Sequence, residues 1–167
     1  MLAPEKLKKA FQKVEDENWM LRAFLKGQDE DELDELVHSM HQELFQSYNC
    51  ISCSNCCKEI VPIIEDSEIK AISIKLGISV DEFSNRYLVE TEDGLSINKK
   101  PCPFLTKEGC SIYECRPNVC KEYPYTDKEE ICTRLINLVG NSEVCPVVFE
   151  IFEKLKKHYG DEFEEYK

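Results

Sequence analysis

The chain has 167 residues, 42 % of them hydrophobic, which is enough to build a core without disulfide or metal staples. Its formal net charge of −12 gives an acidic surface that repels phosphate backbones, so we expect no nucleic-acid partner. The N-terminal segment 1–26 lacks the apolar run of a signal peptide, and no later stretch approaches the roughly 18 apolar residues of a membrane span. We therefore expect a protein without a membrane segment that stays in the reducing cytoplasm.

Two helical segments are predicted ahead of the first cysteine. Residues 4–26 carry apolar side chains at helical spacing, but the polar run at 15–18 interrupts them, so we expect two short helices or one helix with a shifted face. Residues 29–48 have a cleaner helical period, and the acidic residues at their start suit the positive end of the helix dipole. The apolar side of this second helix consists of Leu33, Leu36, Val37, Met40, Leu44 and Tyr48.

The second helix also carries Glu35, His38 and His41 on one ligand-like face. A carboxylate-bridged di-iron bundle needs two Glu-x-x-His motifs and two further carboxylates, whereas this chain has only one such motif. We therefore interpret this face as a solvated helix surface rather than a metal site.

A dense run of cysteines follows this helix directly. The stretch CISCSNCC has the spacing C-x2-C-x2-C-C and contains Cys50, Cys53, Cys56 and Cys57. Thiolates that converge on one point repel each other unless a cation lies between them, and a C-x2-C turn can direct two sulfurs to one ion. The pattern is therefore a strong indication of a metal site.

Several small elements are predicted after this run. Residues 59–64 should be extended, with Pro62 restricting them to an edge or irregular role. A helix should then end at Gly77, and a second short helix should open with the capping box Ser79-x-x-Glu82. A turn leads to a short strand at 95–98.

The segment 101–125 forms a second cysteine block. Its prolines remove backbone donors at intervals, so something other than strand pairing should hold it, and a metal is the obvious candidate. Beyond it, residues 147–159 form an amphipathic helix that we expect Gly160 to stop, leaving 161–167 frayed. The cysteines after the first run are Cys102, Cys110, Cys115, Cys120, Cys132 and Cys145.

These elements predict a small, mostly helical α+β protein. We expect an N-terminal helical segment at 1–48, then a cysteine-rich, metal-stabilised domain at 49–160 that includes the C-terminal helix, and a frayed tail at 161–167. Helices thus flank the metal-binding part on both sides.

Two kinds of metal centre fit the cysteines. C-x2-C-x2-C is the ligand run of a [4Fe–4S] cluster, whose fourth ligand can be a remote cysteine followed by proline, as at Cys102 and Cys145. Alternatively, C-x2-C knuckles could combine with the second block into closed four-thiolate zinc sites. An isolated cysteine is usually a small buried hydrophobe, which is the favoured interpretation of Cys132. For Cys115 both interpretations stay open, because C-x4-C-x4-C with Cys110 and Cys120 could be ligand spacing.

The motifs CISCSNCC, PCPFL, GCSIYE, RPNVC and EYPY, in this order, resemble the YkgJ-type CxxCxxCC family of zinc- or iron-chelating proteins. The resemblance covers residues 50–125 and extends to the Cys145-Pro146 segment. Cys115 and Cys132 lie outside the family pattern. The resemblance implies that the metal ligands are Cys50, Cys53, Cys56, Cys57, Cys102, Cys110, Cys120 and Cys145.

We therefore expect a protein that binds zinc or an iron–sulfur cluster, with no nucleic-acid or membrane partner. One alternative is a metal- or cluster-dependent enzyme that modifies a protein side chain, since flagellin lysine N-methylases carry a similar cluster. Another is a zinc-stiffened module that binds a protein partner. An open coordination position would favour the enzyme, and closed four-thiolate sites would favour the module. The sequence identifies no catalytic residue.

Overall fold

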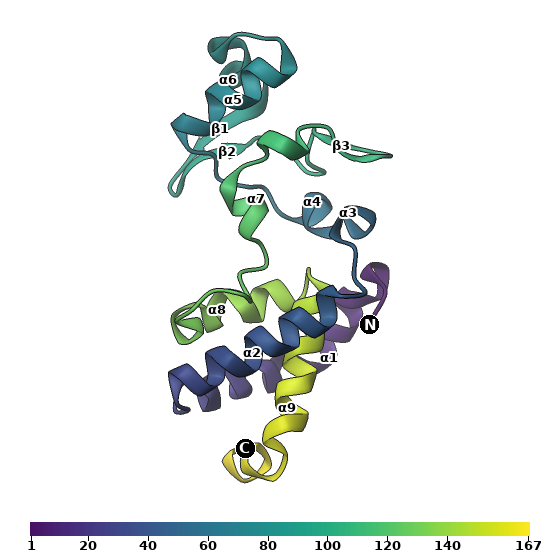
Figure 1. Cartoon of the computed structure of the whole chain (residues 1–167), viewed down its shortest axis with the longest axis vertical. Helices are drawn as coiled ribbons and strands as arrows, with labels where there is room; N and C mark the ends of the chain where they lie inside the picture. The colour runs from purple at the N-terminus through teal and green to yellow at the C-terminus, as the bar shows by residue number, and fades with distance from the viewer. The chain divides into compact units, whose positions relative to one another are not determined.

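The computed structural model describes residues 1–167, and these form two compact units (Figure 1). The helical unit comprises residues 1–49 and 124–167, and the cysteine-rich unit comprises residues 50–123. The predicted mostly helical α+β class is confirmed. The division into units differs from the expected one, because the C-terminal helix packs with the N-terminal helices instead of with the cysteines.

Four helices build the helical unit: α1 (Pro4–Leu25), α2 (Glu30–Phe45), α8 (Ile131–Ser142) and α9 (Pro146–Tyr166). α9 packs against the other three, and α8 packs against α1 and α2. The predicted inward face of α9 is confirmed, because Val148, Ile151, Phe152 and Leu155 are all buried. Amphipathic helices gain most from covering each other's apolar faces, which explains why α9 belongs to this unit.

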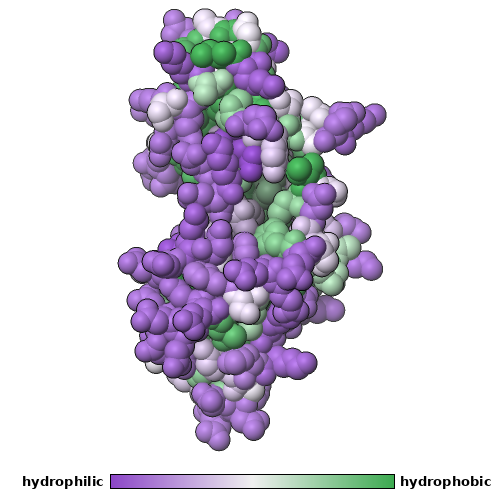
Figure 2. All heavy atoms as spheres, viewed as in Figure 1, coloured by the Kyte–Doolittle hydropathy of each residue, from purple (hydrophilic) through white to green (hydrophobic).

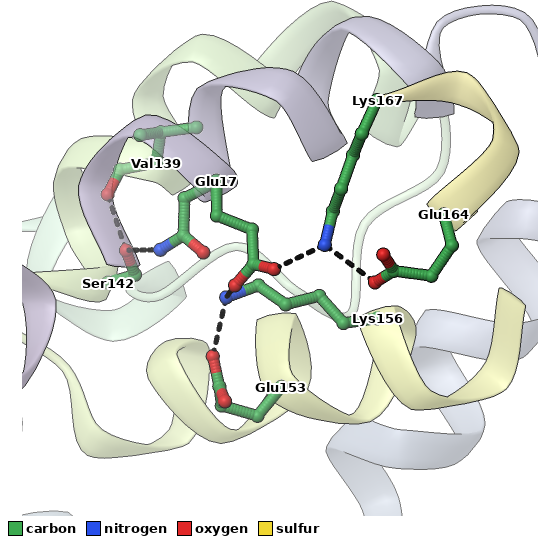
Figure 3. Close-up of polar contacts among 8 residues, drawn as sticks. Glu17, Val139, Ser142, Glu153, Lys156, Glu164 and Lys167 are labelled. Carbon is green, nitrogen blue, oxygen red and sulfur yellow. Dashed lines mark hydrogen bonds and ion pairs between the residues drawn. The ribbon is translucent and has the colours of Figure 1, made fainter. Parts of the chain in front are cut away.

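α1 is one continuous helix, so the alternative of two short helices is not the one observed. Its buried face does not shift either, because Asn18 continues the stripe of Leu7, Phe11 and Leu21. The polar run does not break it because Asn18 is buried and donates to Ser142 Oγ of α8 at 3.4 Å. Ser142 in turn donates to the carbonyl oxygen of Val139 at 2.6 Å (Figure 3). A buried amide with a partner costs little, so the helix tolerates this polar position.

Gly160 bends α9 without ending it. Its φ of 40° is non-helical, yet the chain resumes a helix that continues to Tyr166. The segment expected to fray is anchored by Phe163, which is 1 % exposed and lies 5.5 Å from the ring of Phe24 in α1. Burial of this apolar ring stabilises the last turns of α9 against fraying.

Asp34 of α2 caps the start of α8. Its carboxylate accepts hydrogen bonds from the backbone N–H groups of Glu130 at 2.6 Å and Ile131 at 2.9 Å. Asp34 is only 8 % exposed, and Glu130 has a left-handed φ of 58° at this helix start. The first amides of a helix have no partner within the helix, so a carboxylate supplied by another helix satisfies them.

Glu17 of α1 links α1 to both parts of α9 (Figure 3). Its carboxylate lies 2.9 Å from Lys156 Nζ and 2.6 Å from Lys167 Nζ. The same lysines pair with Glu153 and Glu164 of α9. The hydrogen bonds from Lys167 and then from Lys156 lower the pKa of Glu17 below its usual value.

The cysteine-rich unit is built of short elements. In chain order they are α3 (Cys50–Cys53), α4 (Asn55–Glu59), α5 (Asp66–Leu76), α6 (Val80–Tyr87), β1 (Leu88–Thr91), β2 (Gly94–Ile97), β3 (Leu105–Thr106), β4 (Gly109–Cys110), the 3-10 helix η1 (Tyr113–Cys115) and α7 (Asn118–Glu122). The strands form two antiparallel hairpins, β1 with β2 and β3 with β4. Leu88 pairs with Ile97 in the first hairpin, and Leu105 pairs with Cys110 in the second.

The helix boundaries predicted in this unit are confirmed at two points. Gly77 ends α5 with a left-handed φ of 70°, and Ser79 caps α6 by accepting from the N–H of Glu82 at 3.1 Å. One apolar cluster forms the core, and Cys102, Cys110 and Cys115 pack against it. The cluster consists of Ile64, Ile69, Ile72, Phe83, Ile97, Phe104 and Ile112.

The surface is mostly hydrophilic on the face shown in Figure 2, with hydrophobic residues gathered at the α5–α6 end of the cysteine-rich unit. There Ile74 is 71 % exposed and Val80 is also exposed. No single helix is long and apolar enough to cross a membrane, although α8 and α9 pass that test when taken together across the 116° bend between them.

We expect Asp34→Ala to lower the free energy of unfolding of the helical unit by about 2 kcal/mol, because two amides at the start of α8 lose their acceptor. Urea unfolding followed by the fluorescence of Trp19, the only tryptophan and a residue of α1, measures this change. Asp34→Asn keeps one acceptor oxygen and should lower the free energy of unfolding by a smaller amount. Glu35→Ala, at the exposed next position, should leave the free energy of unfolding almost unchanged. An Asp34→Ala protein as stable as the wild type would contradict the capping role.

The lowered pKa of Glu17 predicts a pH-dependent contribution to stability. A depressed folded-state pKa stabilises the protein above the unfolded-state value of 4.5, and this contribution is lost as the pH falls through the folded-state value. At neutral pH, Glu17→Gln should lower the free energy of unfolding by less than about 1 kcal/mol, because partly exposed ion pairs are screened by solvent. The same Trp19 measurement should show no difference from the wild type once Glu17 is protonated. A loss of equal size in Glu15→Gln, at an exposed position nearby, would show that the pairing is irrelevant.

Candidate metal centre

The first cysteine run folds as two short helices, α3 and α4. Ser54 separates them with a left-handed φ of 49°, and its hydroxyl donates to the carbonyl oxygen of Ile51 at 2.6 Å. Cys50 and Cys53 are therefore three residues apart on α3, where helical spacing puts them on one face. Cys56 and Cys57 lie on α4, and the hydrogen bond from Cys56 raises the pKa of the Cys57 thiol, with burial adding to the shift.

Backbone contacts bring the second cysteine block against the first. The N–H of Cys102 donates to the carbonyl oxygen of Cys57 at 2.8 Å, and Leu105 N–H donates to the oxygen of Cys102 at 3.0 Å. Leu105 also pairs with Cys110 across the β3–β4 hairpin. These contacts place Cys57, Cys102 and Cys110 in one neighbourhood.

Gly109 lets α3 pack against this hairpin. A Cβ atom at Gly109 would lie 2.9 Å from Ile51 Cγ2, and its φ of 114° disfavours any other residue. A side chain here would push α3 away from β4. The glycine thus keeps the cysteines of α3 next to Cys110.

The thiols of Cys57, Cys102, Cys110 and Cys120 influence one another electrostatically. Burial is the main cause of the raised pKa of Cys102 and of Cys110, and the charge of Cys57 adds to both. Cys120 is exposed as a residue, yet desolvation of its thiol, together with the charges of Cys57, Cys102 and Cys110, raises its pKa to about 12. Four partly desolvated thiols that resist ionisation together are a donor set that a cation would stabilise.

The donor chemistry of this unit fits zinc or iron. Its eight cysteines are free thiols, which are soft ligands. No three His, Cys, Asp or Glu side chains already stand in the geometry that would hold a metal ion. The structure therefore groups the thiols of α3, α4 and the second block without arranging them as a coordination sphere.

Cys145 and Cys132 belong to the helical unit. Cys145 is 6 % exposed and precedes α9 as its N-cap, with its N–H donating to the Asn141 oxygen at 2.7 Å. The ligand role that the family resemblance implies for Cys145 stays a prediction. Cys132 lies on α8 with its sulfur 4.0 Å from the carbonyl oxygen of Leu25.

Sequence reasoning missed Arg116. Its guanidinium lies 3.8 Å from the centroid of the Tyr113 ring and donates to the Tyr113 carbonyl oxygen at 2.7 Å. Its positive charge lowers the pKa values of Cys110 and Cys120, against the larger effect of burial. The sequence does contain an indication of this role: the Arg116-Pro117 pair lies between Cys115 and Cys120, so a positive charge lies close to cysteines along the chain.

The Glu35, His38 and His41 face of α2 is only partly solvated. Glu35 is exposed, but His41 Nδ1 lies 2.7 Å from the hydroxyl oxygen of the buried Thr126. Burial lowers the pKa of His41, and the neighbouring His38 lowers it further against the opposing charge of Asp127. His41 therefore serves the packing of the helical unit.

Comparison with known proteins finds matches in the same part of the chain. Residues 49–138, more than half of the sequence, match the family described as "CxxCxxCC: Putative zinc- or iron-chelating domain". The chain is also 32 % identical over 85 residues to the uncharacterized protein MJ0661 of Methanocaldococcus jannaschii, a match that covers 48 % of this chain and 46 % of that protein. The chain thus spans about half the length of this curated relative. No solved structure matches.

The matched segment contains the whole cysteine-rich unit and continues into α8. The resemblance seen in the ordered motifs and the family match therefore agree, and the chain belongs to the CxxCxxCC family of zinc- or iron-chelating domains.

Proposed function

We propose that the cysteine-rich unit is a zinc-binding module in which thiolates from both cysteine blocks ligate the metal. The observation that carries this proposal is the grouping of Cys57, Cys102, Cys110 and Cys120, which come from four separate segments of the unit. Tetrahedral four-thiolate sites that join remote segments are the usual form of structural zinc.

An iron–sulfur cluster is the other candidate, and two observations favour zinc over it. The [4Fe–4S] interpretation uses Cys50, Cys53 and Cys56 with a remote cysteine before a proline. The candidate partner within the cysteine-rich unit is Cys102, and the thiols grouped around it are those of Cys57, Cys110 and Cys120. Zinc also tolerates irregular loops, because its filled d shell imposes no geometry.

The proposed role of the metal is structural. Bound zinc would compensate the thiolate charges and fix the short helices and hairpins of the unit. We place the protein in a reducing compartment such as the cytoplasm, where free thiols persist. A protein partner fits this role, since zinc-stiffened modules commonly present a surface to other proteins.

Metal analysis of protein purified without oxygen tests the choice of metal. We expect colourless protein with about two zinc ions per chain, because the unit holds thiols for two four-thiolate sites. Broad visible absorption that bleaches on reduction, with iron and sulfide in place of zinc, would establish the iron–sulfur alternative. Protein that contains neither metal and takes up neither on reconstitution would refute metal binding altogether.

Removing the metal should unfold residues 50–123 and leave the helical unit folded. Structural zinc contributes apparent binding free energy on the order of 10 kcal/mol, which is comparable to the stability of a whole domain. Hydrogen–deuterium exchange before and after chelation measures the protection of each unit, and Trp19 fluorescence reports on α1. Exchange in 50–123 that is unchanged after complete chelation would show that the metal is not part of the fold.

Arg116→Gln should weaken zinc binding by about 10-fold, the effect typical of removing a partner just outside the ligands. The physical reason is that the guanidinium charge offsets the negative charge of thiolates at Cys110 and Cys120. Competition with a chromophoric chelator measures the affinity. The matched control is Arg86→Gln, which removes the same charge from a guanidinium over Tyr87 in the same unit. Equal effects of both substitutions would mean that only net charge matters.

A further inference from the structure

We propose that the outer face of the first turns of α1 is a docking site for a short acidic segment of a partner protein. The site, called here the lysine hollow, is lined by Leu2, Glu5, Lys6, Lys9, Ala10 and Lys13. All of these residues belong to the helical unit, so the inference goes beyond the zinc-binding function and does not depend on a metal.

Helical spacing brings the three lysines of the hollow to one side of α1. Lys6, Lys9 and Lys13 are three and four residues apart, the separations at which side chains of a helix are neighbours. All three are exposed, whereas Leu2 and Ala10, which line the same hollow, are half-buried. The hollow has a volume of about 350 Å³. It therefore combines some apolar surface with a row of positive charges.

The folding of the helix does not explain this concentration of positive charge. The N-terminal end of a helix is the positive pole of its dipole, which disfavours a lysine such as Lys6 in the first turn. Lysines three or four residues apart also repel one another. Residues 1–13 nevertheless contain four lysines and a single acidic residue, Glu5, in a chain with a net charge of −12. The start of α2 shows the opposite and favourable choice, with three acidic residues in its first turn.

Neighbouring carboxylates leave this face positively charged. The fourth lysine, Lys8, pairs with Glu143 at 3.7 Å, but the ammonium groups of the three lysines of the hollow make no hydrogen bond or ion pair in the structure. Glu17 lies one turn beyond Lys13 and pairs with two lysines of α9 instead. The charges of the hollow are therefore available to an external anion.

The dimensions of the face fit an extended acidic segment. Lys6 and Lys13 are separated by about 10 Å along the helix axis, at about 1.5 Å per residue. In an extended segment, side chains two positions apart point to the same side and are separated by about 6.7 Å. A pair of glutamates with this spacing can place both carboxylates among the three ammonium groups, and their methylene groups can contact Leu2 and Ala10.

The charge around the hollow favours a short segment over an extended polyanion. Screening limits the reach of a charge to about 8 Å at physiological ionic strength, so a short segment interacts mainly with the lysines. A nucleic acid or an anionic membrane covers a wider area and would also meet Glu15 and Asp16, the exposed acidic residues that follow on α1. A second copy of this chain has the same net charge of −12 and is repelled overall.

Binding of a dye-labelled peptide to the full chain tests the proposal. The probe is a peptide of about eight extended residues with blocked ends, in which glutamate alternates with serine. Its control has glutamine in place of every glutamate. Fluorescence anisotropy measures the dissociation constant at low salt. We expect saturable binding of the glutamate peptide that weakens as salt is added, and no binding of the glutamine peptide.

A charge variant of the hollow locates the bound peptide. It combines Lys6→Gln, Lys9→Gln and Lys13→Gln. The dissociation constant should rise by about 10-fold, the effect of losing three exposed ion pairs. The matched control makes the same change of charge at exposed lysines of the cysteine-rich unit, Lys70→Gln, Lys75→Gln and Lys107→Gln. These substitutions should raise the dissociation constant by less than about twofold, because screening removes their effect at a distance.

A second variant tests the hollow itself. Ala10→Gln adds volume to its lining without changing its charge, so this substitution should also raise the dissociation constant of the glutamate peptide. Circular dichroism and Trp19 fluorescence show that the helical unit of each variant is still folded. Unchanged affinity in Ala10→Gln would overturn the docking site at the hollow.

Four other outcomes would overturn the proposal. They are absence of binding to the wild type at low salt, equal losses of affinity in the charge variant and its matched control, tighter lysine-dependent binding of phosphatidylserine vesicles or an RNA oligonucleotide than of the peptide, and a salt-sensitive dimer in sedimentation that the charge variant loses. The last two would assign the hollow to a membrane or nucleic acid, or to a second copy. Zinc content decides the proposed function separately.

Discussion

Burial makes the thiols of Cys102, Cys110 and Cys120 hard to ionise, and repulsion from neighbouring thiolates, Cys57 among them, adds to this cost. The cost of ionising grouped thiols is the constraint on which the cysteine-rich unit depends. Two cations of the protein act on these thiols: Arg116 acts on Cys110 and Cys120, and Lys58 acts on Cys57. A divalent ion between the sulfurs would turn the repulsion into attraction. The same contacts that are unfavourable among bare thiolates would then hold four segments of the chain together.

The regular structure of this unit cannot replace that attraction. Its second hairpin is two residues per strand, and four of its helical elements, α3, α4, η1 and α7, are five residues or shorter. Isolated elements of this length are marginal in water. The apolar cluster joins α5, α6 and the first hairpin to the second cysteine block through Phe104 and Ile112, and it includes no residue of α3, α4 or α7. We infer that a bound metal would stabilise the elements that this cluster does not cover.

Local features of the fold could be predicted from the sequence. The helical period of α2 and the inward face of α9 depend on side chains within a few turns, as do the caps at Gly77 and Ser79. The ordered cysteine motifs also identified the family. These predictions succeeded because periodicity and turn chemistry are properties of short segments.

Pairings across long stretches of sequence could not be predicted. Nothing near α9 shows that its apolar face is covered by α1 and α2 rather than by the cysteine blocks, and nothing near Gly160 shows that Phe163 has Phe24 to pack against. The same limit applies to the site. The order of the motifs does not show that Cys145 belongs to the helical unit, because contacts distant in sequence decide this.

The order of the chain explains how two such different units can share one polypeptide. The cysteine-rich unit is inserted between α2 and α8, so it begins and ends in the helical unit. The segment that follows the cysteine-rich unit is held to α2 by hydrogen bonds. Thr126 bonds to His41 of α2, and the amides of Glu130 and Ile131 donate to Asp34 of α2.

These contacts decide what happens if the insertion loses its order. The helical unit must then close a long flexible loop, but the entropy of closure grows only with the logarithm of loop length, by about 0.6 kcal/mol for each doubling. Bonds from a buried carboxylate and the burial of α9 outweigh a cost of that size. The helical unit can therefore stay folded if the insertion loses its order.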